Sequence, residues 1–168
     1  LEDAKKELSG KKYLIVLDDL GRLVKIAFKK DIENIPVAAA ISTHKGWKER
    51  VQACVNAGVD MIVVDTSDGF NEYTSKVIEE FKNMKTELPI CVGNVITYDG
   101  ARFLLENGAD IIKVGMSSGS ICTTHREKAT GRAPMTALLE ASQARDDYFD
   151  KTGNYVPLVI DGGVSSAG

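Results

Sequence analysis

Short apolar runs alternate with helical patterns from residue 36 onward, and this alternation constrains the fold more than any other feature of the sequence. The apolar runs cover 37–41, 61–64, 89–92, 111–114 and 156–160. The helical patterns between them cover 47–57, 71–85, 98–107 and 135–149. Gly58 and Gly108 stand just past two of these patterns, where a C′ glycine ends a helix. Strict alternation of this kind predicts parallel strands joined by helical crossovers, and therefore an α/β fold.

Polar motifs after the apolar runs distinguish the two folds that this alternation allows, a doubly wound sheet and a (β/α)8 barrel. The motifs are Asp65, Gly93-Asn94, the segment 115–122 and the segment 161–163. A barrel gathers the carboxyl ends of all its strands around one mouth, whereas an open sheet forms a site only at its switch point. We therefore expect a (β/α)8 TIM barrel with about five of its eight strands present, so that the chain is a portion of a larger enzyme.

Residues 1–34 follow a different pattern. The segment 1–8 has helical spacing, and two β-rich runs, 13–17 and 23–28, flank a turn at 18–21, which predicts a β-hairpin. A segment of this size buries too little surface to fold alone. We predict two domains, 1–34 and 35–168.

The composition excludes several classes of protein. The 168 residues carry a net charge of −3, so no basic field attracts nucleic acid or an anionic membrane. No apolar run approaches the ~20 residues of a membrane span. Cys54, Cys91 and Cys122 form an odd set without CxxC spacing, which predicts free thiols in a reducing cytoplasm and argues against disulfides or a zinc site. His44 and His125 are too few for a histidine-rich metal centre.

The glycine- and serine-rich loop after the run 111–114 presents a single cysteine, Cys122. A sulfur at the carboxyl end of a strand is a candidate nucleophile. Only the thiolate attacks, and exposed backbone amides lower a thiol pKa from its usual value of about 8.5. An incidental thiol in a polar loop is the alternative reading of this motif taken alone. Cys54 and Cys91 lie at helix and strand positions and are more typical of core cysteines.

Four motifs together resemble the IMP dehydrogenase and GMP reductase family. They are the cysteine loop GMSSGSICTT at 115–124, DTSDG at 65–69, GNVIT at 93–97 and DGGV at 161–164. They occur in the family's order at family-like intervals, and the resemblance covers roughly residues 36–168. The segment 1–34 is similar to the closing half of a CBS repeat, the module that this family inserts into its barrel. An arbitrary αββ segment is the alternative for residues 1–34.

The resemblance implies covalent catalysis on a purine nucleotide. In the family, the cysteine that matches Cys122 adds to carbon 2 of IMP, a hydride passes to NAD, and hydrolysis releases XMP. In GMP reductase the same cysteine attacks GMP, ammonia leaves, and NADPH supplies the hydride. Thr124 matches a threonine that takes part in proton handling. The family requires no histidine at position 125, and we expect no catalytic role for His125.

The resemblance also implies the residues that bind the substrate. Asp161 would accept hydrogen bonds from both ribose hydroxyls, which suits a carboxylate. Gly163 and Ser120 would contact the phosphate, and Asn94 would face the base or the cysteine loop. Arg126, Lys128 and Arg132 either meet a phosphate or line a wet surface, and we favour the surface.

Cofactor and partners follow from the same resemblance. The residues implied on the side of NAD (alternatively NADP) are Asp65, Ser67 and Gly115, and the implied carbonyl ligands of a potassium ion are Ser117, Gly119 and Cys122. Ser117 departs from the family pattern, which usually has glycine there. A homotetramer and regulatory nucleotides at the CBS-like module are also implied.

Three functions remain open: IMP dehydrogenase, GMP reductase, and a nucleotide-binding regulator without turnover. DTSDG, the CBS-like segment and residues 145–157 favour the dehydrogenase, whereas GNVIT and the CTT of the cysteine loop lean towards the reductase. The intact Cys122, Thr124 and Asp161 argue against the regulator. We expect an NAD-dependent IMP dehydrogenase of guanine nucleotide biosynthesis. The flap and strands that would separate it from the reductase are expected beyond residue 168.

Overall fold

The computed structural model describes residues 13–17, 23–28, 36–117, 119 and 122–164, and the chain divides into two units, Leu1–Val37 and Ala38–Gly168. In the first unit, strand β1 (Tyr13–Leu17) pairs antiparallel with strand β2 (Leu23–Phe28). This pairing is the hairpin that the sequence predicts. The helix expected near 1–8 and the turn expected at 18–21 lie outside the described residues.

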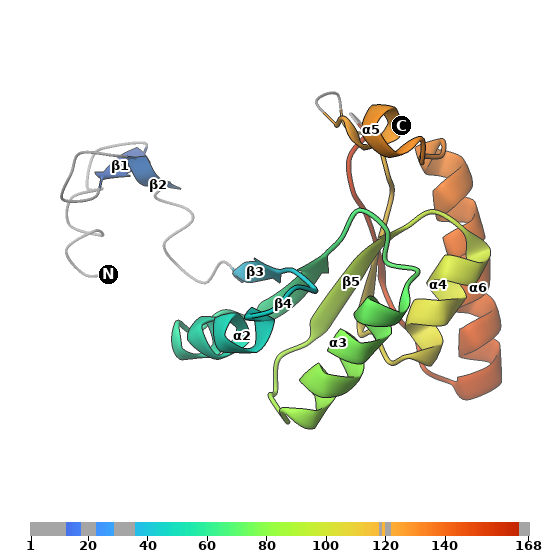
Figure 1. Cartoon of the computed structure of the whole chain (residues 1–168), viewed down its shortest axis with the longest axis horizontal. Helices are drawn as coiled ribbons and strands as arrows, with labels where there is room; N and C mark the ends of the chain where they lie inside the picture. Colours follow the sequence, from blue (N-terminus) through green and yellow to red (C-terminus); the bar gives the residue numbers. More distant parts are fainter. Residues whose placement is uncertain (1–12, 18–22, 29–35, 118, 120–121, 165–168) are drawn as a thin grey trace. The chain divides into compact units, whose positions relative to one another are not determined.

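The second unit is built on a five-stranded parallel sheet (Figure 1). Its strands are β3 (Ala38–Ile41), β4 (Met61–Asp65), β5 (Ile90–Val95), β6 (Ile111–Val114) and β7 (Leu158–Ile160). They lie in the order β3-β4-β5-β6-β7, so each strand pairs with the next one along the chain. Such an order has no reversal point, which an open doubly wound sheet requires for its ligand site. The sequential order agrees with the predicted barrel topology.

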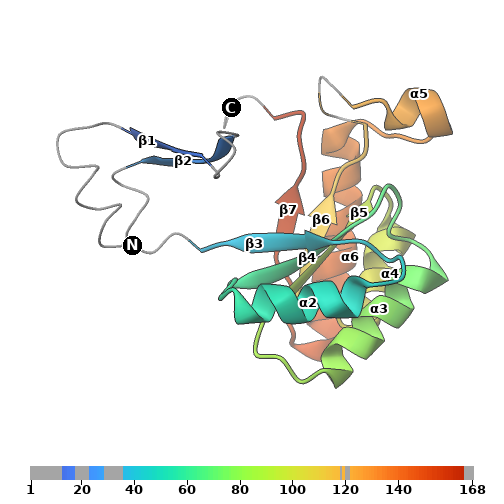
Figure 2. The same ribbon diagram turned by 60° about the vertical axis from the view of Figure 1, so that its left-hand side comes forward.

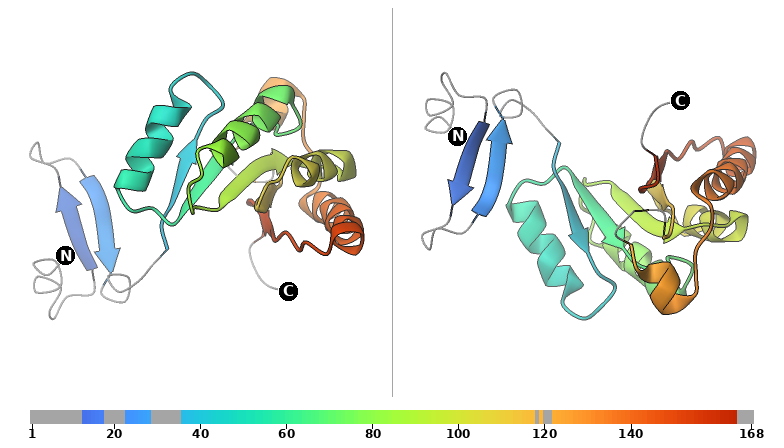
Figure 3. Two further views of the ribbon diagram at one scale, coloured as in Figure 1. Left: turned by 90° about the horizontal axis from the view of Figure 1, so that it is seen from below. Right: turned by 90° about the horizontal axis from the view of Figure 1, so that it is seen from above.

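Helices cover one face of this sheet. The long ones are α2 (Trp47–Asn56), α3 (Glu72–Asn83), α4 (Tyr98–Glu106) and α6 (Pro134–Thr152). They lie in an arc along that face, as Figures 2 and 3 show. A short helix, α5 (Thr124–Lys128), lies beyond the carboxyl ends of the strands (Figure 1). Among the described helices, none combines the length and the apolar character that crossing a bilayer requires.

Local sequence signals fix where the helices begin and end. The side chain of Asn71 accepts a hydrogen bond from Thr74 N (3.0 Å) and caps α3, while the hydroxyl of Thr97 accepts one from Gly100 N (3.1 Å) and caps α4. Pro134 occupies the first turn of α6, where a missing N–H costs nothing. Gly153 ends α6 with φ of 72°, a conformation that favours glycine.

Several predicted boundaries are wrong. Helix α6 continues past Phe149 as far as the glycine cap, and α3 ends at Asn83 because Lys85 adopts a positive φ of 53°. Strand β7 starts at Leu158 because Pro157 has no N–H to donate to the ladder. Strand β5 extends through Gly93 and Asn94, which the sequence placed in the following loop. The sequence did not predict α5, since five residues are too few to show a helical period.

The two faces of the sheet differ because side chains alternate along each strand. One face packs against the helices and forms the core, where each fully buried aliphatic side chain contributes about 1.5–3 kcal/mol. Its buried strand residues are Ile41, Ile62, Val64, Ile90, Val92, Ile112 and Val114. The opposite face carries small or apolar residues such as Ala40 and Val63 along its length, then Lys113, Asp65 and Asp161 towards the carboxyl ends. Charge therefore gathers where the loops begin.

Candidate active site

A pocket of about 360 Å³ lies at the carboxyl ends of the strands. Eight of the residues that line it are candidates from the sequence: Asp65, Ser67, Asn94, Ser117, Gly119, Cys122, Thr124 and Asp161. Thr66 and Met116, which the sequence did not single out, complete the lining. Segments separated by nearly a hundred residues thus meet at one place, as a gathering of strand ends requires. Ser120 lies outside the described residues.

Cys122 is exposed on the loop after β6. Its Sγ atom lies 3.3 Å from the hydroxyl oxygen of Thr124, and its backbone N donates to Gly119 O (3.0 Å). Hydrogen bonds from Thr124, and then from Ser117, hold the pKa of the Cys122 thiol below its ordinary value, because they stabilise the thiolate. The arrangement therefore raises the fraction of reactive thiolate in the pocket.

The outgoing and returning ends of the cysteine loop pack against each other. Ser117 has φ of 63° and its hydroxyl donates to Thr130 O (3.1 Å). Gly131 fits closely here: a Cβ atom at this position would lie 2.9 Å from Cδ2 of His125 and 3.1 Å from Cβ of Ser117. The parts of the loop before and after Cys122 are therefore held together.

Lys113 joins the two carboxylates of the pocket. Its Nζ atom lies 2.7 Å from Asp65 Oδ1 and 2.8 Å from Asp161 Oδ2, and its side chain is only 16% exposed. Partial burial acts to lower the pKa of Lys113, but the hydrogen bonds to Asp161 and Asp65 outweigh it and raise the pKa above its ordinary value. Sequence reasoning missed Lys113. The available signal was a lysine within an otherwise apolar parallel strand, IIKV.

Asn94 connects the loop after β6 to Asp161. The pairing of β5 with β6 shifts register between Gly93 and Val95, and this irregularity falls at Asn94. Its Nδ2 atom donates to Gly115 O (2.7 Å) and to Asp161 Oδ2 (2.9 Å). Hydrogen bonds from Lys113, and then from Asn94, hold the pKa of Asp161 below its usual range. Asp161 is therefore a carboxylate at neutral pH.

The carbonyl oxygen of the Asn94 side chain is buried and lacks a hydrogen-bond partner, one of few such atoms among the described side chains. The residue as a whole is 9% exposed and lines the pocket. An acceptor left unpaired in this way costs about 1–3 kcal/mol. A ligand that places an N–H or O–H donor against this atom would remove that cost.

Hydrogen bonds join the loop after β4 to the carboxyl-terminal part of β5. Thr66 N and Thr66 Oγ1 both donate to Gly93 O (2.9 and 2.8 Å), and Asn94 N donates to Thr66 O (3.1 Å). Gly69 N donates to Asn94 O (2.7 Å). The aromatic ring of Phe70 packs on Phe103 of α4 with ring centroids 5.1 Å apart. The Asp65 side and the Asn94 side of the pocket are therefore held as one piece.

Two further hollows share walls with the pocket. One of about 290 Å³ shares Asp65, Thr66 and Ser67, and its other lining residues are Ser42, Thr43, His44, Asp68, Asn71 and Tyr73. The other, of about 580 Å³, shares Met116 and Ser117 and contains Gly163, His125 and Arg132. Gly163, expected at a phosphate, thus lines this second hollow rather than the pocket of Cys122. Gly115, expected on the cofactor side, contributes its carbonyl to Asn94.

Comparison with known proteins identifies relatives of the whole chain. A family model described as "IMP dehydrogenase / GMP reductase domain" matches residues 6–168. Inosine-5'-monophosphate dehydrogenase from Tritrichomonas foetus is 35% identical over 98% of this chain and 36% of its own length. The protein of that name from Aquifex aeolicus (strain VF5) is 37% identical over 94% of this chain and 31% of its own. Inosine-5'-monophosphate dehydrogenase 2 from Arabidopsis thaliana is 34% identical over 94% of this chain and 34% of its own. The chain spans about a third of the length of these curated relatives.

Proposed function

Because the chain belongs to the IMP dehydrogenase / GMP reductase family, whose fold is the TIM barrel, we propose that it is part of an NAD-dependent IMP dehydrogenase. In this proposal the enzyme oxidises IMP to XMP in guanine nucleotide biosynthesis, through a covalent bond between Cys122 and the purine. The observation that carries the proposal is a thiol with a lowered pKa, paired with Thr124, in one pocket with the carboxylate of Asp161. Three relatives named inosine-5'-monophosphate dehydrogenase also support the dehydrogenase rather than the reductase.

The pocket suits a purine nucleotide. The carboxylate of Asp161 accepts hydrogen bonds from vicinal hydroxyls, which a ribose provides. The unpaired oxygen of Asn94 accepts a donor of the ligand. The adjoining hollow lined by Gly163 gives room for a phosphate near Ser117. We assign the phosphate to Gly163 and Ser120.

The hollow at Ser42–His44 suits the second nucleotide. It shares Asp65 and Ser67 with the pocket of Cys122, so the two adjoin and a dinucleotide would contact these two residues from both. Tyr73, whose side chain is 70% exposed at this hollow, offers an aromatic face to an adenine ring. NAD bound there supplies a hydride acceptor. Asp65, Ser67 and the backbone at Gly115 are the residues assigned to it.

The base of the cysteine loop suits a potassium ion held by the carbonyl groups of Ser117, Gly119 and Cys122. The family usually has glycine at position 117, and Ser117 adopts the positive φ of 63° that glycine would favour. A carbonyl ligand needs no particular side chain, so the serine is compatible with the ion. Potassium would order the loop around Cys122.

The residues of this chain act as follows. The Cys122 thiolate, stabilised by Thr124, would attack carbon 2 of IMP and form a carbon–sulfur bond. NAD, held by Asp65, Ser67 and the backbone at Gly115, would supply the acceptor for the hydride that carbon 2 loses. Asp161 holds the ribose, and Asn94 together with Lys113 fixes the carboxylate of Asp161. Water would then add to carbon 2 and give up a proton that Thr124 passes to solvent, the sulfur would leave as thiolate, and XMP would be released.

Further parts of the proposal rest on family membership alone. We propose a cytoplasmic homotetramer, and we propose that residues 1–34 belong to a CBS-like module that binds regulatory nucleotides.

GMP reductase is the second candidate, favoured by GNVIT at 93–97 and by the CTT sequence that contains Cys122. The test is the absorbance of reduced nicotinamide with the full-length protein, in the presence of IMP plus NAD and, separately, of GMP plus NADPH. We expect reduction of NAD with IMP, faster in potassium than in sodium salts. Oxidation of NADPH with GMP and no reaction with IMP would replace the dehydrogenase by the reductase. A protein that binds nucleotide and reacts in neither assay would be a regulator.

A further inference from the structure

An ion pair closes the cysteine loop at the point where the chain leaves it. The guanidinium of Arg132 pairs with the carboxylate of Glu140 on α6 through two contacts, Nη1–Oε2 at 2.9 Å and Nη2–Oε1 at 2.5 Å. The two side chains are only 35% and 32% exposed. Two parallel contacts of this kind fix direction as well as distance. The sequence analysis left Arg132 at a phosphate or on a wet surface and favoured the surface, and neither reading predicts this ion pair.

The same pair reaches the segment that follows β5, two residues after Asn94. Glu140 Oε2 also accepts a hydrogen bond from Tyr98 N (3.1 Å), in the first turn of α4, and Arg132 Nη1 lies 3.5 Å from Ile96 O. Ile96 follows Asn94 by two residues. A carboxylate at the start of a helix is favoured by the helix dipole and by the unpaired N–H groups there. Glu140 is therefore fixed by α4 on one side and by Arg132 on the other.

Directly before Arg132, Gly131 packs against Ser117 and His125, which belong to the outgoing part of the loop and to α5. Ser117 in turn contributes to the lowered pKa of Cys122. The contacts thus run without a gap from Glu140 through Arg132 and Gly131 to the surroundings of the thiol.

We propose that Arg132 and Glu140 are positioning residues that clamp the cysteine loop against the start of α4 and so set the place of Cys122 in the pocket. The inference deepens the proposed function and rests on it for the role of Cys122 as nucleophile. Neither residue lines the pocket of Cys122, whereas Arg132 also lines the adjoining hollow assigned to the phosphate, so the clamp is tested by a reaction of Cys122 that needs no substrate. Its effect is expected on the reactivity of Cys122 and on kcat.

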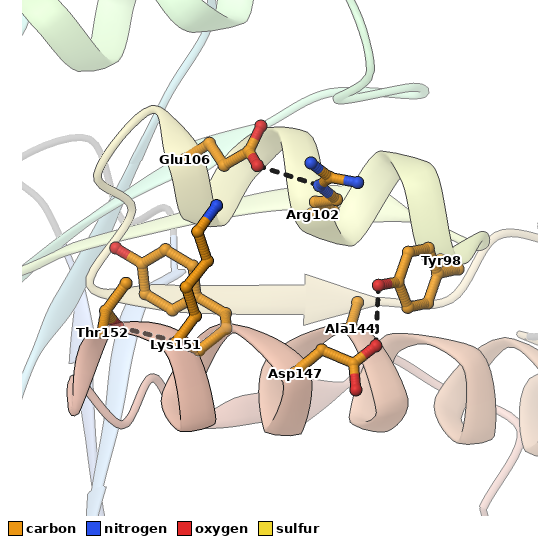
Figure 4. Close-up of a pocket in the computed structure, with 8 residues that line it drawn as sticks. Tyr98, Arg102, Glu106, Ala144, Asp147, Lys151 and Thr152 are labelled. Atoms are coloured by element: carbon orange, nitrogen blue, oxygen red, sulfur yellow. Dashed lines mark hydrogen bonds and ion pairs between the residues drawn. The ribbon is translucent and has the colours of Figure 1, made fainter.

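The molecule offers a matched control in the contact between α4 and α6. Tyr98 Oη donates to Asp147 Oδ2 (2.7 Å), seven residues along α6 from Glu140, and Figure 4 shows the two side chains facing each other across the helices. They line a separate hollow of about 250 Å³ with Arg102 and Lys151. Tyr98→Phe removes this hydrogen bond but keeps the backbone N–H that Glu140 accepts. It weakens the same helix pair and leaves Arg132 untouched.

Two further variants test the clamp in the full-length protein. Arg132→Glu places two carboxylates together and opens the clamp, whereas Arg132→Glu/Glu140→Arg restores an inverted pair. The inverted pair loses the acceptor for Tyr98 N and puts a cation at the start of α4, so we expect its melting temperature to stay low. Positioning and stability are therefore separated within one series.

The reactivity of Cys122 is measured as its rate of alkylation by iodoacetamide at pH 7. Mass spectrometry follows the tryptic peptide 114–126, which contains Cys122 and no other cysteine. We expect Arg132→Glu to slow alkylation and to lower kcat about tenfold, a size typical of residues coupled to a site from outside it. The inverted pair should recover both, and Tyr98→Phe should change neither.

The clamp is wrong if the rates follow the melting temperature across all variants, or if Arg132→Glu leaves alkylation unchanged. Alkylation needs no substrate, so the two proposals fail separately. The expected alkylation series in a protein that does not oxidise IMP would support the clamp and reject the proposed function.

Discussion

Cys91 and Cys122 show that a cysteine has a different exposure and pKa in the body of the sheet and in the loops at its carboxyl end. Cys91 lies in β5, is 2% exposed, and has its pKa raised to about 11, chiefly by burial. Cys122 lies exposed beyond β6, and hydrogen bonds from Thr124 and Ser117 lower its pKa. Burial penalises the thiolate, whereas donors around an open site favour it.

The difference teaches that reactivity here depends on position along the strand axis. Cys91 lies on the same face of the sheet as Lys113, and the charge of Lys113 lowers the pKa of Cys91 while Asp161 and Asp65 raise it. Burial still decides the outcome. A cysteine a few residues short of the strand end is therefore a core residue, and the one beyond the end is exposed and has a lowered pKa.

The sharpest test of this comparison replaces each cysteine by alanine. We expect Cys122→Ala to reduce turnover of IMP by at least ~10³-fold, as loss of a covalent nucleophile does. Cys91→Ala should leave kcat within about twofold and lower the free energy of unfolding by about 1 kcal/mol, because a small buried side chain is lost. Steady-state rates and urea unfolding of both variants provide the measurement. Near-normal turnover in Cys122→Ala would remove the covalent mechanism.

Differential alkylation measures the same contrast without any substrate. At pH 7 a thiol with a pKa of about 11 is thiolate in about one molecule in 10⁴, and the lowered pKa of Cys122 gives it a larger thiolate fraction. We expect iodoacetamide to modify the exposed Cys122 on the order of 100-fold faster than the buried Cys91 in the native protein. Urea-unfolded protein is the control, in which the two rates should agree within a few-fold. Comparable native rates would contradict the contrast.

Asp161→Asn tests whether the negative charge at the carboxyl ends of the strands binds the nucleotide or only stabilises the sheet. An amide accepts poorly from two ribose hydroxyls, so we expect KM for IMP to rise about tenfold or more, the size of one lost charge-assisted hydrogen bond. Cys91 should stay unreactive, since burial and not Asp161 dominates its pKa. Titration with IMP and its 2′-deoxy analogue checks the assignment. If the variant still distinguishes the two nucleotides as the wild type does, Asp161 does not hold the ribose.

The sheet could be predicted from the sequence because each strand is a short apolar run between clear helical patterns. Each of the five parallel strands lies within two or three residues of its predicted place, and Asn71 and Thr97 cap their helices as their residue types favour. The pocket residues could be predicted because the carboxyl ends of parallel strands meet. That argument needs only the position of Asp65 or Cys122 along the chain.

The ion pairs and hydrogen bonds of the site depend on distances between residues far apart in sequence. The periodicity of apolar residues does not show these distances. In the sequence Lys113 is an isolated charge, and only the structure shows Asp65 and Asp161 within 2.8 Å of it. The pairing of Arg132 with Glu140 depends on how α6 packs beside the cysteine loop. The extension of β5 through Asn94 depends on hydrogen bonds to Thr66, which a pattern of apolar residues does not show.

Gly93 has a consequence for the mutational tolerance of the chain. A Cβ atom at this position would lie 2.4 Å from the backbone oxygen and 2.6 Å from the Cβ atom of Lys113. Every residue has this oxygen, and every residue except glycine has this Cβ atom. Replacing Lys113 by another residue with a side chain therefore makes no room for a Cβ atom at position 93. In a saturation library, position 93 should therefore accept only glycine, whereas position 113 accepts changes that cost activity before they cost folding. The charge at position 113 can therefore change during evolution without loss of the fold, whereas the backbone contact between positions 93 and 113 cannot.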